Sequence, residues 1–166
     1  MKYIFHILFL VAIALHTNAE VRLPSMISDK MILQRDTKLK IWGWADPQEK
    51  VTVRFAGDFY YTAATDEGKW FVELPPQAAG GPHVVEVNEI VIRDVLFGDV
   101  WLCSGQSNME TPIERLVERF PEINVSNNHM IRYFKVPTQN TTHSISENIP
   151  NGSKWYSGVA SEVMNW

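Results

Sequence analysis

The stretch DVWLCSGQSNMETPIE, residues 99–114, places serine hydroxyls between an apolar run and a helix-start signal. A serine hydroxyl attacks an ester carbonyl once a base takes its proton, and backbone N–H groups at a turn or helix start stabilise the oxyanion that forms. Ser107 follows Gly105 and precedes the helix signal, which suits the apex of a turn. Ser104 lies within or at the end of the apolar run, and Cys103 resembles a small core residue. Ser107 is therefore the candidate nucleophile.

Two predicted elements position this serine. The continuous apolar run Val100–Cys103 predicts a strand buried on both faces of a parallel sheet. The sequence Thr111-Pro112-Ile113-Glu114 predicts a helix start, with threonine as the cap, proline at the first helical position and glutamate three residues after the cap. A strand, a tight turn and a helix would hold Ser107 at the carboxyl edge of the sheet, where open α/β sheets bind ligands.

A purely structural role for Ser107 stays open on this pattern alone. Gly-x-Ser is a frequent sequence, and most such serines close a turn or cap a helix. The Gly-x-Ser-x-Gly elbow of other hydrolases is not matched, because Met109 stands where the last glycine would be.

Residues 21–92 show strand patterning. Short apolar runs of period two alternate with turn residues, as where Val51, Val53 and Phe55 alternate with Thr52 and Arg54. We predict an antiparallel β-sandwich domain over residues 20–93 and a second domain over residues 94–166. In the second domain, Ile131–Val136 predicts a further strand and Thr138–Ser153 a surface loop.

The stretch LKIWGW, residues 39–44, does not fit one core face. Leu39 and Ile41 point to one side of a strand, and Trp42 and Trp44 point to the other. Three explanations are open: a bulge at Gly43, a tryptophan face packed against a neighbouring domain, or a platform on which sugars stack. Burial in a core is the commonest outcome for tryptophan.

The first nineteen residues predict a secretory signal peptide. Lys2 precedes an apolar run, Ile4–Leu15, and small or polar residues end at Ala19. The run is too short to span a bilayer, so we expect cleavage after Ala19, a secreted or periplasmic protein and no membrane attachment. Triplets at Asn124, Asn140 and Asn151 match the glycosylation acceptor pattern.

The composition argues against nucleic-acid binding and against a fold that depends on a disulfide bond. Without the leader, fourteen basic residues stand against nineteen acidic ones and no basic cluster is present, which disfavours nucleic-acid binding. Cys103 is the single cysteine, so the fold does not depend on an internal disulfide.

The block Asp99–Glu110 closely resembles the nucleophile block of the sialate O-acetylesterase family, a branch of the SGNH hydrolases related to acetylxylan esterases. The stretches Leu23–Arg35 and Ile41–Ala45 also resemble the N-terminal β-domain of that family. The resemblance implies a multi-domain protein, in which an all-β, jelly-roll-like sandwich precedes the start of an α/β SGNH-type hydrolase domain.

The resemblance implies a carbohydrate esterase that removes O-acetyl groups from sialic acids or other glycans without a metal or cofactor. Ser107 is carried over as nucleophile, and its own backbone N–H as oxyanion donor. Gln106 and Asn108 are candidates for orienting the turn or lining the pocket, with simple turn hydrogen bonding as the alternative.

The resemblance also implies a catalytic Asp-x-x-His motif, which this sequence lacks. We expect His83, His129 and His143 to be structural or solvated residues. Residues 94–166 are too few to bury the core of a parallel sheet, so we expect a truncated, N-terminal fragment that is inactive alone. The alternative function is a glycan-binding or spacer sandwich without catalysis, in which Trp42, Trp44 or Trp70 stacks on sugar.

Overall fold

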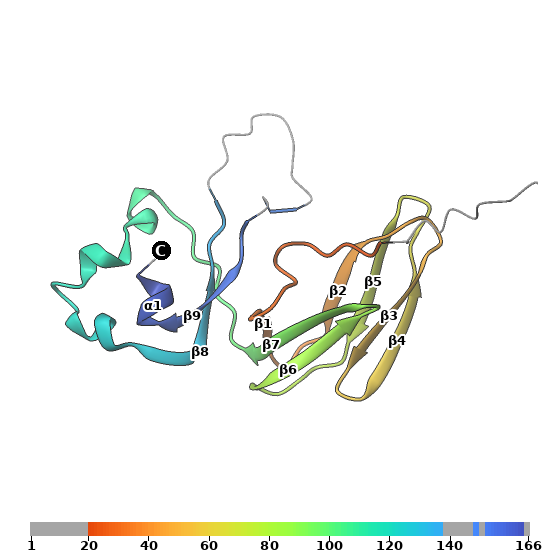
Figure 1. The fold of residues 1–166 in the computed structure, drawn as a ribbon, viewed down its shortest axis with the longest axis horizontal. Coiled ribbons are helices and arrows are strands. Elements are labelled where there is room, and N and C mark those ends of the chain that lie inside the picture. The colour runs from red at the N-terminus through yellow and green to blue at the C-terminus, as the bar shows by residue number, and fades with distance from the viewer. Residues whose placement is uncertain (1–19, 138–147, 150–151, 165–166) are drawn as a thin grey trace, which may run out of the picture.

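The computed structural model describes residues 20–137, 148–149 and 152–164, which form two parts (Figure 1). The first part is a sandwich built from seven strands. Its larger sheet has five strands in the order β1-β7-β6-β3-β4, and its smaller sheet pairs β2 with β5. The strands are β1 (Ile32–Gln34), β2 (Leu39–Trp44), β3 (Lys50–Phe55), β4 (Asp58–Ala63), β5 (Lys69–Leu74), β6 (Gly80–Val87) and β7 (Ile90–Gly98).

The predicted alternation of apolar and polar residues forms the core between these two sheets. Val51, Val53 and Phe55 of β3 are buried, and so are Trp70 and Val72 of β5, while the residues between them are half-buried or exposed. Every second side chain of a strand faces the same way, so one face of each sheet is apolar. The β-rich sandwich expected for the first part is present.

Two details of the sandwich differ from the prediction. β1 pairs with β7 in parallel, whereas every other pairing in the sandwich is antiparallel. β7 also runs on to Gly98, past the boundary predicted after residue 93. The reason is that Val95 and Phe97 still point into the sandwich core, so the strand continues as long as its apolar face finds that core.

The tryptophans of β2 are not placed as expected. β2 and β5 pair in continuous register, so there is no bulge at Gly43. Gly43 faces inward, where a Cβ atom would lie 2.2 Å from the Arg22 carbonyl oxygen and 3.0 Å from the Trp70 ring. Trp42 is exposed and Trp44 half-buried on the outer face, with their rings edge to face 5.2 Å apart. Of the three tryptophans on β2 and β5, Trp70 is the one buried in the core, which is the commonest outcome for tryptophan.

The predicted buried strand Val100–Cys103 is wrong for this structure. Residues 99–105 have no regular secondary structure, and Val100, Trp101, Leu102 and Cys103 are all exposed. A strand buried on both faces needs neighbouring strands and a covering layer on each face. Within the described part of the chain, no strand pairs with this segment, and its apolar side chains are exposed.

The predicted helix beginning after Thr111 is also wrong. Three short 3₁₀ helices follow one another instead: η1 (Ser107–Glu110), η2 (Ile113–Leu116) and η3 (Pro121–Val125). Thr111 ends η1, and Pro112 precedes η2 rather than taking its first position. Helices draw most of their stability from packing an apolar face, and η2 and η3 contain no buried residue.

The second part ends in an antiparallel pair and a single helical turn. β8 (Asn127–Phe134) pairs with β9 (Trp155–Val159), and α1 (Ala160–Val163) follows. The strand expected at 131–136 is therefore present but begins and ends earlier, and it pairs antiparallel with β9. The leader, most of the predicted surface loop, His143 and two of the acceptor triplets, at Asn140 and Asn151, lie outside the described residues. In the described ranges, no helix is long and apolar enough to cross a bilayer.

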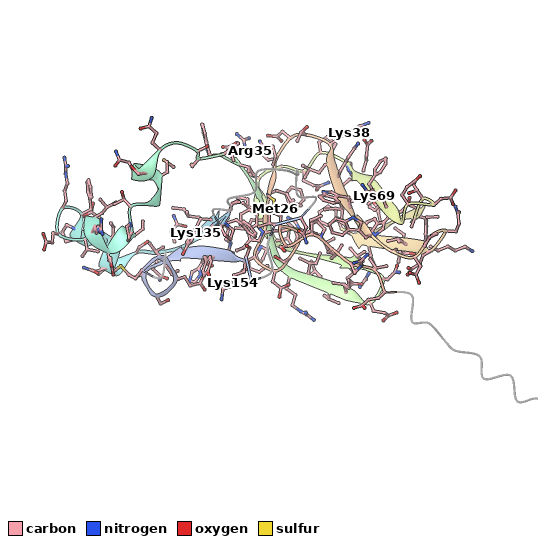
Figure 2. The ribbon with its side chains drawn as sticks, turned by 90° about the horizontal axis from the view of Figure 1, so that it is seen from above. Met26, Arg35, Lys38, Lys69, Lys135 and Lys154 are labelled. Atoms are coloured by element: carbon pink, nitrogen blue, oxygen red, sulfur yellow. The ribbon has the colours of Figure 1, made fainter. Side chains whose placement is uncertain are left out.

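Side chains of the second part contact the sandwich at the junction between the two parts, near Met26 (Figure 2). Trp155 of β9 is buried, and its indole N–H donates to the Met26 carbonyl oxygen at 2.8 Å. Lys30 forms an ion pair with Glu162 of α1. Arg132 of β8 forms an ion pair with Asp94 of β7 at 2.8 Å. The second part thus takes its packing partners from the sandwich.

Candidate active-site turn

Ser107 lies at the start of a tight, hydrogen-bonded turn. The chain bends at Gln106, and Ser107 is the first residue of η1. The Met109 N–H donates to the Gln106 carbonyl oxygen at 2.9 Å, and the Thr111 N–H donates to the Asn108 carbonyl oxygen at 3.3 Å. These backbone bonds close the turn, so the bend expected before the serine is present although the strand before it is not.

The Met109 side chain folds back against Gly105. A Cβ atom on residue 105 would lie only 2.9 Å from Cγ of Met109. Any larger residue would push the methionine side chain away from the turn. The Gly-x-Ser-x-Met spacing in this stretch therefore has a local packing reason.

The three predicted site residues Gln106, Ser107 and Asn108 are brought together and are all exposed. The Ser107 hydroxyl makes no hydrogen bond to any residue in the described ranges, so a substrate can reach it. Ser104 and Cys103 are exposed as well, which contradicts the core position expected for Cys103. Ser104 lies in irregular chain, whereas Ser107 lies in the closed turn.

No histidine meets Ser107 in the described part of the chain. His83 belongs to β6, and its ring packs edge-on against Phe55 and Phe97, with centroids 5.7 and 5.4 Å apart. His129 is exposed on β8. Both fit the structural or solvated roles expected for them. Among the described residues, no group of three or more His, Cys, Asp or Glu side chains is placed to hold a metal ion.

The entry to the turn is held by two residues that pattern reasoning did not single out. Arg35 donates from Nε to Oδ1 of Asp99 at 2.9 Å, and the Val100 N–H donates to Oε1 of Gln34 at 2.9 Å. The hydrogen bond with Asp99 raises the pKa of Arg35 above its ordinary value. Gln34 and Arg35 end the stretch Leu23–Arg35, whose resemblance to known β-domains was the only sequence signal for them.

This arrangement supplies one half of a nucleophilic site. Ser107 is exposed at the start of a 3₁₀ turn, and the first N–H groups of such a turn have no acceptor within it. Such a serine is reactive only when a base takes its proton, and the described residues provide none at hydrogen-bond distance.

The chain is similar in sequence to several known proteins. No protein-family model matches the sequence. The chain is 34% identical over 135 residues to a sialate O-acetylesterase of Pongo abelii, a match that covers 71% of this chain and 26% of that protein. It is 34% identical over 117 residues to the Homo sapiens sialate O-acetylesterase and 32% identical over 117 residues to that of Mus musculus. The chain thus spans about a quarter of the length of these relatives.

A solved structure extends the likeness to the fold. The crystal structure of a carbohydrate acetylesterase from Xanthomonas citri superposes with a TM-score of 0.80 at 33% sequence identity. The match covers 89% of this chain and 34% of that one. So large a share of this chain includes residues from both parts, not the sandwich alone.

Proposed function

We propose that this chain, whose kinship with the sialate O-acetylesterases is confirmed by these comparisons, carries the nucleophile of a serine esterase that deacetylates glycans. The observation that carries the proposal is the Ser107 hydroxyl, exposed and without a hydrogen-bond partner in the described ranges, at the start of the closed turn. The similarity to a sialate O-acetylesterase and to a carbohydrate acetylesterase supports an O-acetylated carbohydrate as the substrate class.

The reaction follows from what a serine on such a turn can do. Oγ of Ser107 attacks the acetyl carbonyl carbon while a base takes the hydroxyl proton. The N–H of Ser107 donates to the oxyanion, and the side chains of Gln106 and Asn108 orient the turn or line the pocket. The sugar oxygen leaves with the proton. Water then attacks the acetyl-serine, acetate departs, and the hydroxyl is restored. None of these steps requires a metal or a cofactor.

The base belongs to polypeptide outside this sequence, because the sequence contains no Asp-x-x-His. We infer that residues 94–166 are the opening part of an α/β SGNH-type domain in a longer, multi-domain enzyme. The exposed apolar run at Val100–Leu102 supports this inference, since a sheet that added strands beside it would bury it. The 166-residue chain alone is then inactive, because an unactivated serine is a poor nucleophile.

The test replaces Ser107 with alanine in an active polypeptide that contains these residues. Turnover of 4-nitrophenyl acetate should fall by a factor on the order of ~10⁶, the size seen when a triad nucleophile is removed. Ser104→Ala is the matched control: it removes the hydroxyl of another exposed serine three residues away and should leave turnover within about tenfold of the parent. Retained activity in Ser107→Ala, or loss only in Ser104→Ala, would show that the nucleophile is wrongly assigned.

We also propose, from the leader pattern of residues 1–19, that the protein acts outside the cytoplasm. A leader of this pattern directs export and is then removed. N-terminal sequencing of the exported protein should begin at Glu20. A mature protein that still begins at Met1 would contradict this export route.

A further inference from the structure

A pair of aromatic side chains stands on the outer face of the five-stranded sheet. Phe59 and Tyr61, two residues apart on β4, are 56% and 75% exposed. Their ring planes are 10° apart and their centroids 6.3 Å apart. Both rings belong to the face turned away from the core, because the half-buried Tyr60 and Thr62 lie on the other side of the strand.

Polar side chains border these rings in the neighbouring strands. Arg54 of β3 is the register partner of Phe59, and Thr52 is the partner of Tyr61. Glu86 of β6 is in turn the partner of Arg54. The guanidinium of Arg54 contacts both carboxylate oxygens of Glu86, with Nε donating to Oε2 at 2.8 Å. The charges of Arg54 and Glu86 therefore offset each other, while hydrogen-bonding groups remain at the surface.

We propose that this face, defined by Phe59, Tyr61, Arg54 and Glu86, is a glycan-binding site that takes a neutral pyranose unit of a polysaccharide. A pyranose ring carries an apolar C–H face and a rim of hydroxyl groups. The negative faces of Phe59 and Tyr61 attract the C–H bonds, and Arg54 and Glu86 offer a donor and an acceptor for the rim hydroxyls. The site is separate from Ser107, so binding does not depend on the proposed ester hydrolysis.

The chemistry of this face fits a sugar better than a protein partner. Stable protein interfaces bury about 800 Å² on each partner and have a dry apolar centre. Here two rings are bordered by an ion pair and a threonine, so the apolar part is small and its border is polar. A neutral, locally amphipathic surface complements a neutral, amphipathic ligand.

The opposite face of the sandwich is the less suitable platform, although it carries the tryptophans singled out from the sequence. Trp70 is buried in the core. Trp42 packs edge-on against Trp44, and the ammonium of Lys40 lies 4.5 Å from the centroid of the Phe71 ring. Because the Trp42 and Trp44 ring planes are 72° apart, whereas those of Phe59 and Tyr61 are 10° apart, the tryptophans form no flat surface, and this face provides the matched control.

The experiment measures binding of xylohexaose, a chain of neutral pyranoses, and of 6′-sialyllactose to the 166-residue chain by calorimetry and saturation-transfer NMR. The sugars are used up to about 10 mM, where a millimolar dissociation constant gives saturation. We expect xylohexaose to bind, with magnetisation transferred from aromatic protons. The double variant Phe59→Ala/Tyr61→Ala should bind at least about tenfold more weakly, as truncated aromatic anchors do.

Two controls separate stacking from other effects. Tyr61→Phe keeps the ring and should keep most of the affinity, and Phe71→Ala removes an exposed ring of the opposite face and should bind as the parent does. Thermal unfolding of each variant checks that the sandwich is intact.

Several results would overturn the proposal: no binding of either sugar, equal losses in the two alanine variants, or a loss confined to Phe71→Ala. Self-association of the parent that the Phe59→Ala/Tyr61→Ala variant abolishes would instead make this face a protein interface. Binding retained in Ser107→Ala would show that the glycan site stands even if the proposed catalysis does not.

Discussion

The sandwich and the second part of the chain differ in where their apolar side chains lie. In the described ranges, every buried hydrophobic residue except Trp155 falls between Val21 and Phe97. Of the fifteen large hydrophobic residues that are exposed among those the structure describes, nine fall between Val100 and Val136. Both parts contain ample apolar residues, so composition does not explain the difference. The sandwich closes two sheets over one core, whereas the described residues of the second part form a single pair of strands.

We infer from this difference that contacts with the sandwich stabilise the second part. Trp155 is buried against residues of the sandwich core, with Phe134 packed beside it. Trp155, Lys30 with Glu162, and Asp94 with Arg132 are side-chain connections that cross the junction. We therefore expect changes in the sandwich core to cost most, changes at the junction to cost less, and changes in the exposed apolar run to cost least.

The largest effect is expected in the sandwich core. Phe55 is fully buried against Phe97, and Phe55→Ala should lower the free energy of unfolding by about 3–5 kcal/mol because it leaves a cavity. Leu102 is 93% exposed, and Leu102→Ala should change it by less than about 0.5 kcal/mol. Urea titration followed by circular dichroism measures both. A similar loss of unfolding free energy in the two variants would contradict the expected difference between the two parts.

The next effect concerns the junction pair of Arg132 and Asp94. The Arg132 side chain is only 2% exposed, so Asp94→Asn leaves a buried guanidinium without its countercharge, at a cost of about 2–3 kcal/mol. Asparagine tolerates the positive φ of 58° at this position. Asp99→Asn removes the carboxylate from an exposed ion pair with Arg35 and should cost under about 1 kcal/mol. A cost for Asp94→Asn no greater than that of Asp99→Asn would mean that the junction pair does not hold the parts together.

A smaller effect appears only in alkali and reports on Tyr133 of β8. Burial, with the neighbouring Tyr156 and Glu162 adding to it, raises the pKa of Tyr133 to about 12 from 10.0. The pKa of Tyr133 is higher in the folded state than in the unfolded state. Its contribution to the free energy of unfolding is therefore fully present below pH 10 and is lost as the pH rises to about 12. Stability measured across this window should fall less steeply in Tyr133→Phe than in the parent. Identical slopes would show that Tyr133 is not sheltered.

The smallest effect is expected at the Lys30–Glu162 ion pair, which is partly exposed. The hydrogen bond from Lys30, followed by that from the Ser157 N–H, lowers the pKa of Glu162 below 4.5. The folded pKa is the lower one, so this contribution is present above about pH 4.5 and is lost as the pH falls through the folded pKa. Glu162→Gln should cost about 1 kcal/mol at neutral pH and nothing in strong acid. A cost that persists unchanged in acid would point to packing rather than charge.

The candidate site was predicted from the sequence only in part. The Gly105–Met109 spacing indicated an exposed serine on a turn, and the turn is present because its hydrogen bonds and the Gly105–Met109 contact are local. The strand before the turn and the long helix after it were not found. Each depends on layers that packing must supply, and periodicity does not reveal whether those layers are present. The hydrogen bonds that Gln34 accepts and Arg35 donates at the entry of the turn join residues more than sixty positions apart, and no local pattern predicts them.

By itself, the sequence determined the features whose causes lie within a few residues: the alternation that makes β3 and β5 one-sided, and the turn that presents Ser107. Tertiary structure decided which apolar residues are buried. Val95 and Phe97 lie in the sandwich core, while Val100 and Leu102, which are equally apolar, stay in solvent. The physical reason is that burial requires an opposing surface, and distant parts of the chain provide that surface for one segment and not for the other.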